Sequence, residues 1–340
     1  MAWAIFYNGA VFKYEKGGPR VDPQRILTKY KGNPILSPSD MPYPCETVYN
    51  SGVAKLGDEY ILLLRVGLHD GKSVFGLARS KDGFHFQVHP EPVFQKAESG
   101  IFKEAENKGV EDPRVTQIGD TYYIFYSCYS TRGFQIGLAK TKDFLTIERM
   151  ALTTAVDYRN CVLFPEKING MYVRFERPNL VYLGHPGIWI SYSPDLIHWG
   201  EQQLIMTADP HDIWQDYKIG PGAPPIKTPR GWLNIYHATT QTMAGQIYRL
   251  GVAVHDLHDP RKVIGRSHRF ILAPEALHER VGYVGNVVFT NGAIAEADGT
   301  IKLYYGGADT CMNVATGKVD DLIDLALEDG PDTTVERILQ

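Results

Sequence analysis

The sequence has few cysteines, and they are scattered. Its 340 residues include four, Cys45, Cys128, Cys161 and Cys311, and none of these belongs to a C-x-x-C pair. This spacing argues against a disulfide framework and against a cysteine-based zinc site. The 11 histidines form no H-x-x-x-H pattern on a predicted helix, since His85/His89 and His255/His258 lie in strand or turn contexts, so we expect no metal site. Free thiols are typical of a reducing compartment, so a cytoplasmic location is expected.

The sequence also lacks a basic excess and a long apolar run. Lys and Arg number 35 and Asp and Glu number 39, which gives a formal net charge of −4. Nucleic acids and acidic membranes are therefore not expected as partners. No apolar stretch approaches the length of a membrane span. The N-terminal MAWAIFYNGAVFKYEKGG lacks the basic start, long apolar segment and cleavage site of a secretory signal, so we expect none.

What the sequence does have is a repeat, present in five copies. Each copy is a two-residue turn between β-rich runs, as in VAKLGDEYILLLR and VTQIGDTYYIFYS. Such turns are strong hairpin signals, and repetition at this spacing is typical of propellers. We predict an all-β fold, a five-bladed β-propeller in which residues 1–340 form a single domain. The predicted turns are Gly57-Asp58, Gly119-Asp120, Asn169-Gly170, Arg230-Gly231 and Asp298-Gly299.

A second repeat places a Ser or Thr two residues before an Asp. It occurs in FGLARSKDGFHF, IGLAKTKDFLTI and IWISYSPDLIHW. Short polar side chains of this kind bond their own backbone and fix a turn, so we interpret these residues as structural. The pairs are Ser80 with Asp82, Thr141 with Asp143, and Ser193 with Asp195.

Three segments fall outside the repeats. Residues 1–45 form an N-terminal arm with one possible strand at 3–7, and a terminal strand can complete a shared blade and remove an exposed sheet edge. Residues 319–340 form a C-terminal tail. Within it, 319–330 is predicted to be a short amphipathic helix that places Leu322, Ile323, Ala326 and Leu327 on one face. Residues 91–110 are predicted to form a long polar loop.

Topology predicts where the unusual polar residues meet. In an antiparallel blade, the residues before the first strand and after the second strand lie on the same face. The innermost strands of a propeller line its central channel, so these residues should converge on one funnel mouth. Before first strands lie Asn50, Ser51, Glu111, Asp112, Arg114, Arg159, Asn160 and Lys218, and after second strands lie Arg65, His237 and Asp309.

The residue types at this mouth suit an anion and a sugar. Arg65, Arg159, Lys218 and His237 would surround a compact multivalent anion, because arginine binds phosphate oxygens in a bidentate way. A carboxylate could protonate a leaving oxygen. Each residue alone has an ordinary structural explanation, such as a salt bridge for Arg65. Their shared position in the topology is what favours a functional site.

At these residues the chain resembles a known family, the inverting β-mannoside phosphorylases of glycoside hydrolase family 130, which are five-bladed propellers. The resemblance covers roughly residues 30–325. It rests on motifs that include YNSGVAKLGDEYILLLR, EDPRVTQIGDTYYIFYS, YRNCVLFPEKINGMYV, YKIGPGAPPI, GWLNIYHA and YYGGADT.

The resemblance implies a role for each candidate residue. Asp112 in the EDPR motif would be the general acid, acting through a sugar hydroxyl. The implied phosphate ligands are Arg65, Arg159, Asn160, Lys218, His237 and Tyr248. The implied mannose-binding residues are Asn50, Ser51, Arg114 and Asp309.

The expected reaction is the reversible phosphorolysis of a β-mannoside to α-mannose 1-phosphate, with inorganic phosphate as a substrate and no cofactor. One alternative is a phosphate-independent hydrolase, which would need a base such as Asp309 or Glu111. Another is a non-catalytic propeller that binds a protein or glycan. The sequence leaves open a β-1,4 or β-1,2 linkage, with mannose, glucose or N-acetylglucosamine as the acceptor sugar. The acceptor subsites would come from loops such as 91–110 and 178–187, and the terminal segments could mediate a homo-oligomer.

Overall fold

The computed structural model describes residues 5–7, 10–12, 26–179 and 187–339, and most of its regular structure is β-strand. This confirms the predicted all-β class. None of the helices in these ranges has the length and apolar character that a membrane crossing requires. The helices are η1 (Pro38–Asp40, a single 3₁₀ turn), α1 (Gly100–Ala105), α2 (Leu277–Arg280), α3 (Val319–Glu328) and α4 (Thr334–Leu339).

The largest sheet joins two groups of antiparallel strands through one parallel bridge between Ser73 and Gly109. Between the groups, the segment predicted as a polar loop at 91–110 contains the short helix α1 and the start of β8. The strands of the first group are β4 (Thr47–Leu56), β5 (Glu59–Gly67), β6 (Ser73–Ser80) and β7 (Gln87–Val88). Those of the second are β8 (Gly109–Ile118), β9 (Thr121–Ser130), β10 (Gly133–Thr141) and β11 (Glu148–Leu152).

Three further sheets of antiparallel strands follow in the chain. The third group holds β12 (Tyr158–Leu163), β13 (Tyr172–Pro178), β14 (Ile188–Ser193) and β15 (Gly200–Met206). The fourth holds β16 (Lys218–Pro221), β17 (Ile226–Thr228), β18 (Gly231–Thr242), β19 (Gly245–His255) and β20 (Val263–Arg266). The fifth holds β21 (Val288–Ala295), β22 (Thr300–Gly307), β23 (Cys311–Lys318) and the early strand β3 (Thr28–Lys29).

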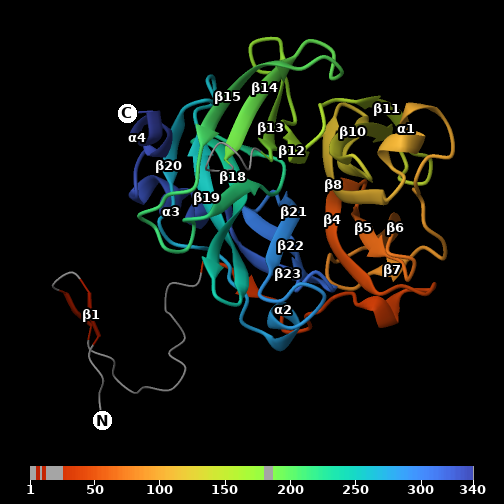
Figure 1. Cartoon of the computed structure of the whole chain (residues 1–340), viewed down its shortest axis with the longest axis horizontal. Coiled ribbons are helices and arrows are strands. Elements are labelled where there is room, and N and C mark those ends of the chain that lie inside the picture. The colour runs from red at the N-terminus through yellow and green to blue at the C-terminus, as the bar shows by residue number, and fades with distance from the viewer. Residues whose placement is uncertain (1–4, 8–9, 13–25, 180–186, 340) are drawn as a thin grey trace.

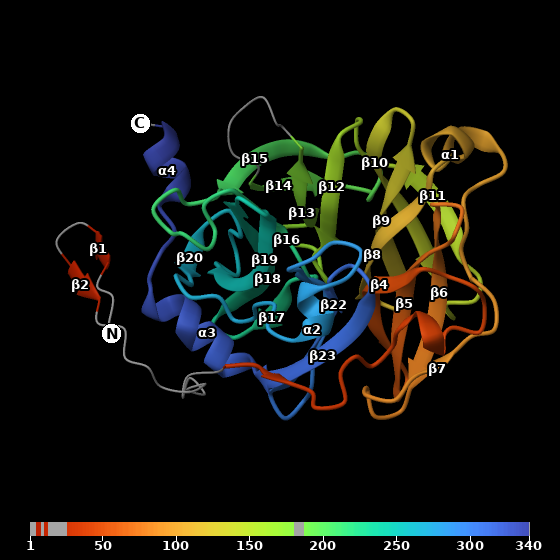
Figure 2. The same cartoon turned by 60° about the horizontal axis from the view of Figure 1, so that its bottom comes forward.

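The groups follow one another around the molecule in chain order. Figure 1 shows β4–β7 in orange, then β8–β11, β12–β15 in green, β18–β20 in teal and β21–β23 in blue, and Figure 2 shows the same succession from a second direction. Contacts join β4 to β8, β8 to β12, β12 to β16 and β21 to β4. None of the described sheets closes on itself. Because the first strands of the groups contact one another, they bring together residues that are far apart in the sequence.

Three of the five predicted turns lie at the expected residues. Gly57-Asp58, for example, links β4 to β5, and Gly119-Asp120 links β8 to β9. The turn predicted at Asp298-Gly299 closes one residue earlier, where the Gly299 amide donates to the Glu296 carbonyl at 3.0 Å. The prediction of Arg230-Gly231 is wrong by one residue, because Gly231 already pairs with Thr228 across the strands. The Thr228 hydroxyl donates to the Gly231 carbonyl (2.7 Å) and accepts from the Arg230 amide, which closes the turn one residue earlier.

The Ser/Thr-x-Asp repeats are structural turns, as predicted. Ser80 Oγ accepts a hydrogen bond from the Gly83 amide at 2.9 Å, and the Asp82 carboxylate accepts one from the His85 amide at 2.9 Å. The turns at Thr141 and Ser193 repeat this pattern. These acidic residues bind their own backbone and line none of the site described below.

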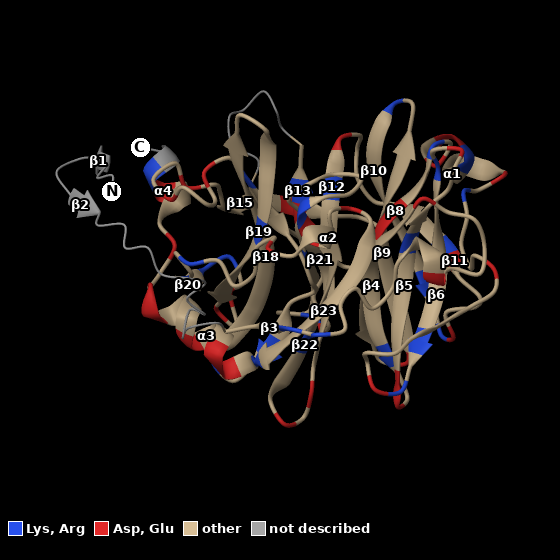
Figure 3. Ribbon diagram, turned by 90° about the horizontal axis from the view of Figure 1, so that it is seen from below, with Lys and Arg blue, Asp and Glu red and all other residues tan. Residues whose placement is uncertain are grey.

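Segments near both ends of the chain pack on the fourth and fifth groups of strands. The N-terminal strand β3 pairs with β23, which confirms that an N-terminal strand completes a sheet. The possible strand at 3–7 corresponds to β1 (Ile5–Tyr7), which pairs with β2 (Ala10–Phe12). Helix α3 buries Leu322, Ile323 and Ala326, as its amphipathic pattern predicts, and packs on β19 and β20. Its outer side is acidic, whereas charges of both signs are interspersed over the remaining ribbon (Figure 3).

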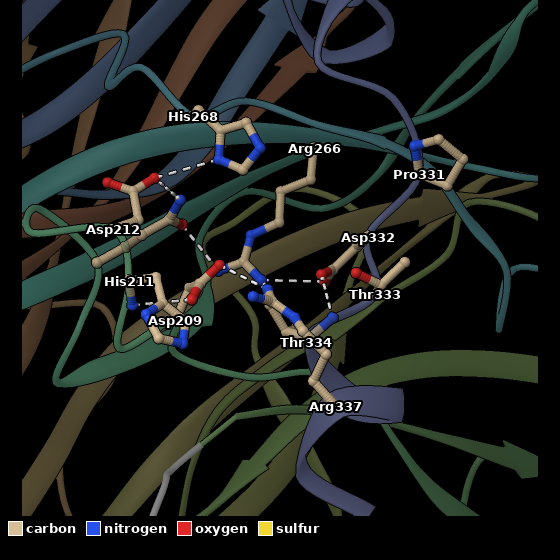
Figure 4. Close-up of a pocket in the computed structure, with 11 residues that line it drawn as sticks. Asp209, His211, Asp212, Arg266, His268, Pro331, Asp332, Thr333, Thr334 and Arg337 are labelled. Carbon is tan, nitrogen blue, oxygen red and sulfur yellow. Dashed lines mark hydrogen bonds and ion pairs between the residues drawn. The ribbon is translucent and has the colours of Figure 1, made fainter. Parts of the chain in front are cut away.

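A buried ion pair fixes the C-terminal tail to the body. Arg266 Nη1 lies 3.0 Å from Asp332 Oδ2, and both side chains are 3% exposed. Arg337 binds Asp209 at 2.7 Å, and Gln215 accepts from Arg266 at 2.8 Å. These residues line a cavity of about 520 Å³ (Figure 4). Because their charges satisfy one another, we interpret this cavity as part of the anchor for the tail.

Candidate active site

A pocket of about 430 Å³ lies where the groups of strands meet. All five groups contribute to it, which is what the topological argument from the sequence predicts. Nine of the eleven predicted site residues line the pocket, namely Asn50, Arg65, Asp112, Arg159, Asn160, Lys218, His237, Tyr248 and Asp309.

The other two predicted residues, Ser51 and Arg114, lie behind the wall of the pocket. Arg114 is 2% exposed. Its guanidinium donates to the Gly222 carbonyl at 2.9 Å and to Asn160 Oδ1 at 3.2 Å. Ser51 is equally buried and its hydroxyl contacts Met312 Sδ at 3.6 Å. In the structure these two side chains support the pocket residues from behind.

β-Bulges turn the first-strand residues into the pocket. The left-handed backbone region is adopted more readily by Asn and Asp than by most residues, and Asn50, Asp112 and Asn160 have φ values of 44°, 50° and 55°. A bulge bends the strand and re-aims a side chain. The backbone geometry therefore explains why Asn or Asp occupies these positions. The register shifts lie between Tyr49 and Gly52, between Glu111 and Arg114, and between Arg159 and Val162.

One half of the site is built from carboxylates around a single arginine. Arg65 binds Glu111 at 2.8 Å and Asp112 at 2.9 Å, and the Asn50 amide donates to Asp112 at 3.1 Å. Burial acts to raise the pKa of Asp112, but the nearby Arg65 and Arg114 outweigh burial and hold that pKa below its usual value. Burial raises the pKa of Glu111. Asp112 is therefore the ionised partner of Arg65 in the free site.

Asp309 holds a proton more readily than Asp112. It follows the glycines that end β22 and has a φ of 50°. Burial raises the pKa of Asp309 to about 7; Arg65 opposes this shift and Asp112 adds to it. At neutral pH this carboxyl group is therefore divided between its protonated and ionised forms.

The other half of the site is a cationic cluster, formed by Arg159, Arg177, Lys218 and His237. Arg159 and Arg177 are direct cross-strand partners on β12 and β13, an arrangement that is destabilising for like charges. Within the described ranges, no carboxylate lies within ion-pair distance of Arg159, Arg177 or Lys218. The cluster therefore lacks the direct ion pairs that Arg65 has.

The pKa values of Lys218, Arg177 and His237 are lowered by burial and by the repulsion between positive charges. Burial, followed by the charges of Arg177 and Arg159, lowers the pKa of Lys218 to about 7. Burial and Arg159 lower the pKa of Arg177 to about 10, and burial and Arg177 hold the pKa of His237 well below its usual value. A bound anion would relieve this repulsion.

Unpaired polar atoms in the cluster also point to a ligand. Arg177 Nε and His237 Nδ1 are buried and have no hydrogen-bond partner among the described residues. Buried polar atoms in folded proteins almost always have one. Lys218 Nζ, by contrast, lies 2.8 Å from the Tyr248 hydroxyl, which joins the two side chains.

Arg177 is the main residue that the sequence analysis missed. It lies at the end of β13, in RFERP, at the same place in its group that Arg65 occupies on β5. The rule that selected residues after second strands would have found it. Asp157 and Asn179 also line the pocket, as do Phe134 and Phe289, but they carry no comparable signal in the sequence.

The described residues contain no group of three or more His, Cys, Asp or Glu placed to hold a metal ion. The site instead joins a cation cluster, which could bind a multivalent anion, to carboxylates that can exchange a proton. The two halves share one pocket, so an anion and a proton donor could act on the same substrate.

Comparison with known proteins agrees with this geometry. A family model for glycoside hydrolase family 130, described as β-1,4-mannooligosaccharide phosphorylase, matches residues 19–328. The chain is 40% identical over 251 residues to a β-1,2-mannobiose phosphorylase of Listeria innocua, across 74% of this chain and 68% of that protein. It is 35% identical over 313 residues to a β-1,4-mannooligosaccharide phosphorylase of Ruminococcus albus, across 89% of this chain and 91% of that one.

The fold is also similar to that of a solved structure. The β-1,2-mannobiose phosphorylase from Listeria innocua, in complex with β-1,2-mannobiose, aligns with a TM-score of 0.80 and 32% sequence identity. The alignment covers 88% of this chain and 99% of that one.

Proposed function

Because the chain belongs to glycoside hydrolase family 130, we propose that it is an inverting phosphorylase that cleaves β-mannosides with inorganic phosphate. The products are α-mannose 1-phosphate and a shortened acceptor, and the reaction is reversible. The observation that supports this most directly is the cation cluster of Arg159, Arg177 and Lys218, which forms no ion pair among the described residues and shares a pocket with Asp112.

Phosphate binds in the cation cluster. The two guanidinium groups match phosphate oxygens in a bidentate way, and Lys218 acts as a point charge. The remaining phosphate ligands are Asn160, His237, Tyr248 and Arg65. Arg65 contributes least to charge neutralisation, because Glu111 and Asp112 already share its charge.

Asp112 is the general acid and acts through a hydroxyl of the bound mannose. In the free site Asp112 is ionised, which is the form required to accept a proton when the reaction runs towards synthesis. For phosphorolysis it must first take up a proton. Asn50 and Asp309 hold the mannose unit. Ser51 and Arg114 shape this subsite from behind the pocket wall, where Arg114 donates to the Asp112 carbonyl. Phosphate attacks from the face opposite the leaving group and inverts the anomeric centre, so no base is needed to activate water.

The architecture that presents this site is a five-bladed propeller. The proposal is supported by five groups of antiparallel strands that succeed one another around the molecule (Figure 2). In addition, β21 of the last group contacts β4 of the first. It is also supported by a pocket to which all five groups contribute. The whole chain is one catalytic domain, and β3 of the N-terminal arm completes the last blade.

Three further properties belong to this proposal. Phosphate is itself the nucleophile, so the reaction requires no cofactor. All four cysteines are free, which is typical of a reducing compartment, so we place the enzyme in the cytoplasm. The terminal segments are the surfaces through which a homo-oligomer would form.

The test is product analysis with a panel of β-mannosides, with and without inorganic phosphate. Mannose 1-phosphate that forms only when phosphate is present supports the proposal. β-1,2-Mannobiose and β-1,4-mannooligosaccharides come first, because the relatives act on these linkages. The best substrate identifies the linkage.

A second test addresses the cation cluster. Arg177→Ala should raise the KM for phosphate by about tenfold or more while changing the KM for the mannoside little, because a lost charged hydrogen bond costs about 1.5–3 kcal/mol. Equal changes in both KM values would contradict a phosphate role for Arg177.

One observation favours a second candidate, a phosphate-independent mannoside hydrolase. Asp309 has a pKa of about 7, which suits a general base that activates water at neutral pH. Release of free mannose at the same rate with and without phosphate would support the hydrolase and overturn the phosphorylase.

A further inference from the structure

Arg159 lies over an aromatic stack that borders the pocket. Its guanidinium carbon is 3.3 Å from the centre of the Phe134 ring. On its other side Phe134 stacks on Tyr129, with ring centroids 4.4 Å apart and ring planes within 4° of parallel. Tyr129 and Phe134 are cross-strand partners on β9 and β10, whereas Arg159 lies on β12 of the next group. The stack therefore joins two groups of strands at the site.

The stack is the contact that fixes Arg159. Two other arginines close to aromatic rings, Arg149 and Arg65, are also held by carboxylates. Arg149 lies 4.0 Å from the Phe94 ring and makes hydrogen bonds to Glu106. Arg65 lies 4.7 Å from the Tyr49 ring and binds two carboxylates. Within the described part of the chain, Arg159 has no carboxylate partner of this kind.

Arg159 also faces a repulsive neighbour. Arg177 is its direct cross-strand partner, and in an empty site two adjacent guanidinium groups separate unless something holds them. An aromatic face attracts a guanidinium and fixes its plane. The ring covers one face of Arg159 and leaves the N–H donors at the edge of the guanidinium free to bind an anion. Such preorganisation reduces the conformational entropy that the side chain loses when the anion binds.

We propose that Phe134 is a positioning residue: its ring, backed by Tyr129, holds the Arg159 guanidinium in the orientation that binds phosphate before phosphate arrives. This inference rests on the proposed phosphate role of the cluster. It assigns a function to an aromatic side chain that need not touch the reacting atoms.

The test measures the binding of inorganic phosphate alone, by calorimetry, to the full-length protein and two variants. Phe134→Leu keeps an apolar side chain but removes the aromatic face, and should weaken phosphate binding about tenfold, within the range of a partly desolvated cation–π contact. Phe134→Trp restores an aromatic face and should bind phosphate within about threefold of the parent protein. Unchanged binding in Phe134→Leu, or equal losses in both variants, would overturn the inference.

A matched control separates this effect from a general loss of stability. Phe94→Leu removes the ring beside Arg149, which Glu106 continues to hold. It should lower the melting temperature without changing phosphate affinity. If Phe94→Leu weakened phosphate binding as much as Phe134→Leu, the effect would be structural and the inference would fail.

The experiment also distinguishes the inference from the proposed function. Phosphate binding is measured without a sugar, so it does not depend on turnover. If the parent protein binds phosphate and Phe134→Leu does not differ from it, only the positioning role fails. If the parent protein neither binds phosphate nor forms mannose 1-phosphate, the proposed function fails and the inference fails with it.

Discussion

At the residue scale, the site separates its charges by sign. Asp112 and Glu111 share Arg65, whereas Arg159, Arg177 and Lys218 lie together and form no ion pair with a described carboxylate. The energetic cost of placing like charges together is offset when a multivalent anion binds. The site is thus arranged for its ligand rather than for the stability of the empty protein.

Replacing the proposed acid tests the carboxylate half. Asp112→Asn keeps the size of the side chain and an oxygen that can face Arg65, but it can no longer exchange a proton. We expect turnover to fall by about 10²–10⁴-fold, the usual contribution of general acid–base catalysis, while mannoside binding measured by calorimetry persists. The control is Asp143→Asn in a surface turn, which should leave turnover unchanged. Near-normal activity of Asp112→Asn would rule out Asp112 as the acid.

The pKa of Lys218 predicts how anion affinity depends on pH. In the free site this pKa is lowered to about 7, and a bound anion raises it because the charged form is then favoured. As pH rises through 7, the free enzyme loses the proton that binding requires. Affinity should therefore fall about tenfold per pH unit above 7, until the pKa of the complex is reached.

Sulfate is the suitable probe, since its own charge is constant between pH 6 and about 9. Asp309 titrates in the same range, so the measurement uses an Asp309→Asn background. Lys218→Arg stays charged over this range, and its sulfate affinity should be nearly flat with pH. Parallel slopes for the two proteins would show that Lys218 is not the titrating group.

At the element scale, the first strands are held together by a buried amide. Asn291 lies at the register shift of β21, and its Nδ2 donates to the Asn50 carbonyl of β4 at 2.8 Å and to the Pro113 carbonyl of β8 at 3.2 Å. One side chain thus joins three strands next to the bulges that carry Asn50 and Asp112.

Asn291→Ala would leave these buried carbonyls without a donor, which costs about 1–3 kcal/mol. We expect a loss of about 2 kcal/mol in the free energy of unfolding in urea, together with reduced turnover, because the bulges lose their common support. The control is Asn107→Ala, whose side chain bonds Thr131 at the surface, with a loss of at most about 0.5 kcal/mol. If Asn291→Ala matched the control in stability and turnover, this role would be refuted.

At the scale of the whole molecule, the ends of the chain complete the body. Strand β3 extends the last sheet, and the tail is anchored by Arg266 and Asp332 (Figure 4). Gln215 accepts hydrogen bonds from both Arg266 and the Tyr236 hydroxyl. Tyr236 directly precedes the site residue His237 in the sequence. The C-terminal tail is therefore connected to the fourth group of strands close to the pocket.

Removing the buried carboxylate of this anchor should destabilise the protein strongly. Asp332→Ala leaves Arg266, 3% exposed, as a buried charge without its carboxylate, which costs about 3 kcal/mol or more. The measurement is the midpoint of chemical denaturation. The exposed ion pair of Arg230 and Asp324 supplies the control, since Asp324→Ala should cost less than about 1 kcal/mol. Similar losses for the two variants would show that the tail is not anchored in this way.

The family resemblance supplied Tyr248, and the sequence by itself determined the strand class, most of the turns and eight residues of the pocket. These features follow from local rules: turn residues fix hairpins, and the alternating direction of strands places the ends of distant hairpins on one face. The same rule predicts a site position for Arg177, which lies near the end of β13 as Arg65 lies near the end of β5.

Only the tertiary structure decided how the charges are paired. Asp112 and Glu111 turn to Arg65, whereas Arg159 and Arg177 pair across β12 and β13, and Arg159 rests on Phe134. It also placed Ser51 and Arg114 behind the pocket. These outcomes depend on bulges and on packing between groups of strands. A bulge shifts the register by one residue and so redirects a side chain, and the interaction of two charges depends on their distance and burial, which the order of residues in a sequence does not contain.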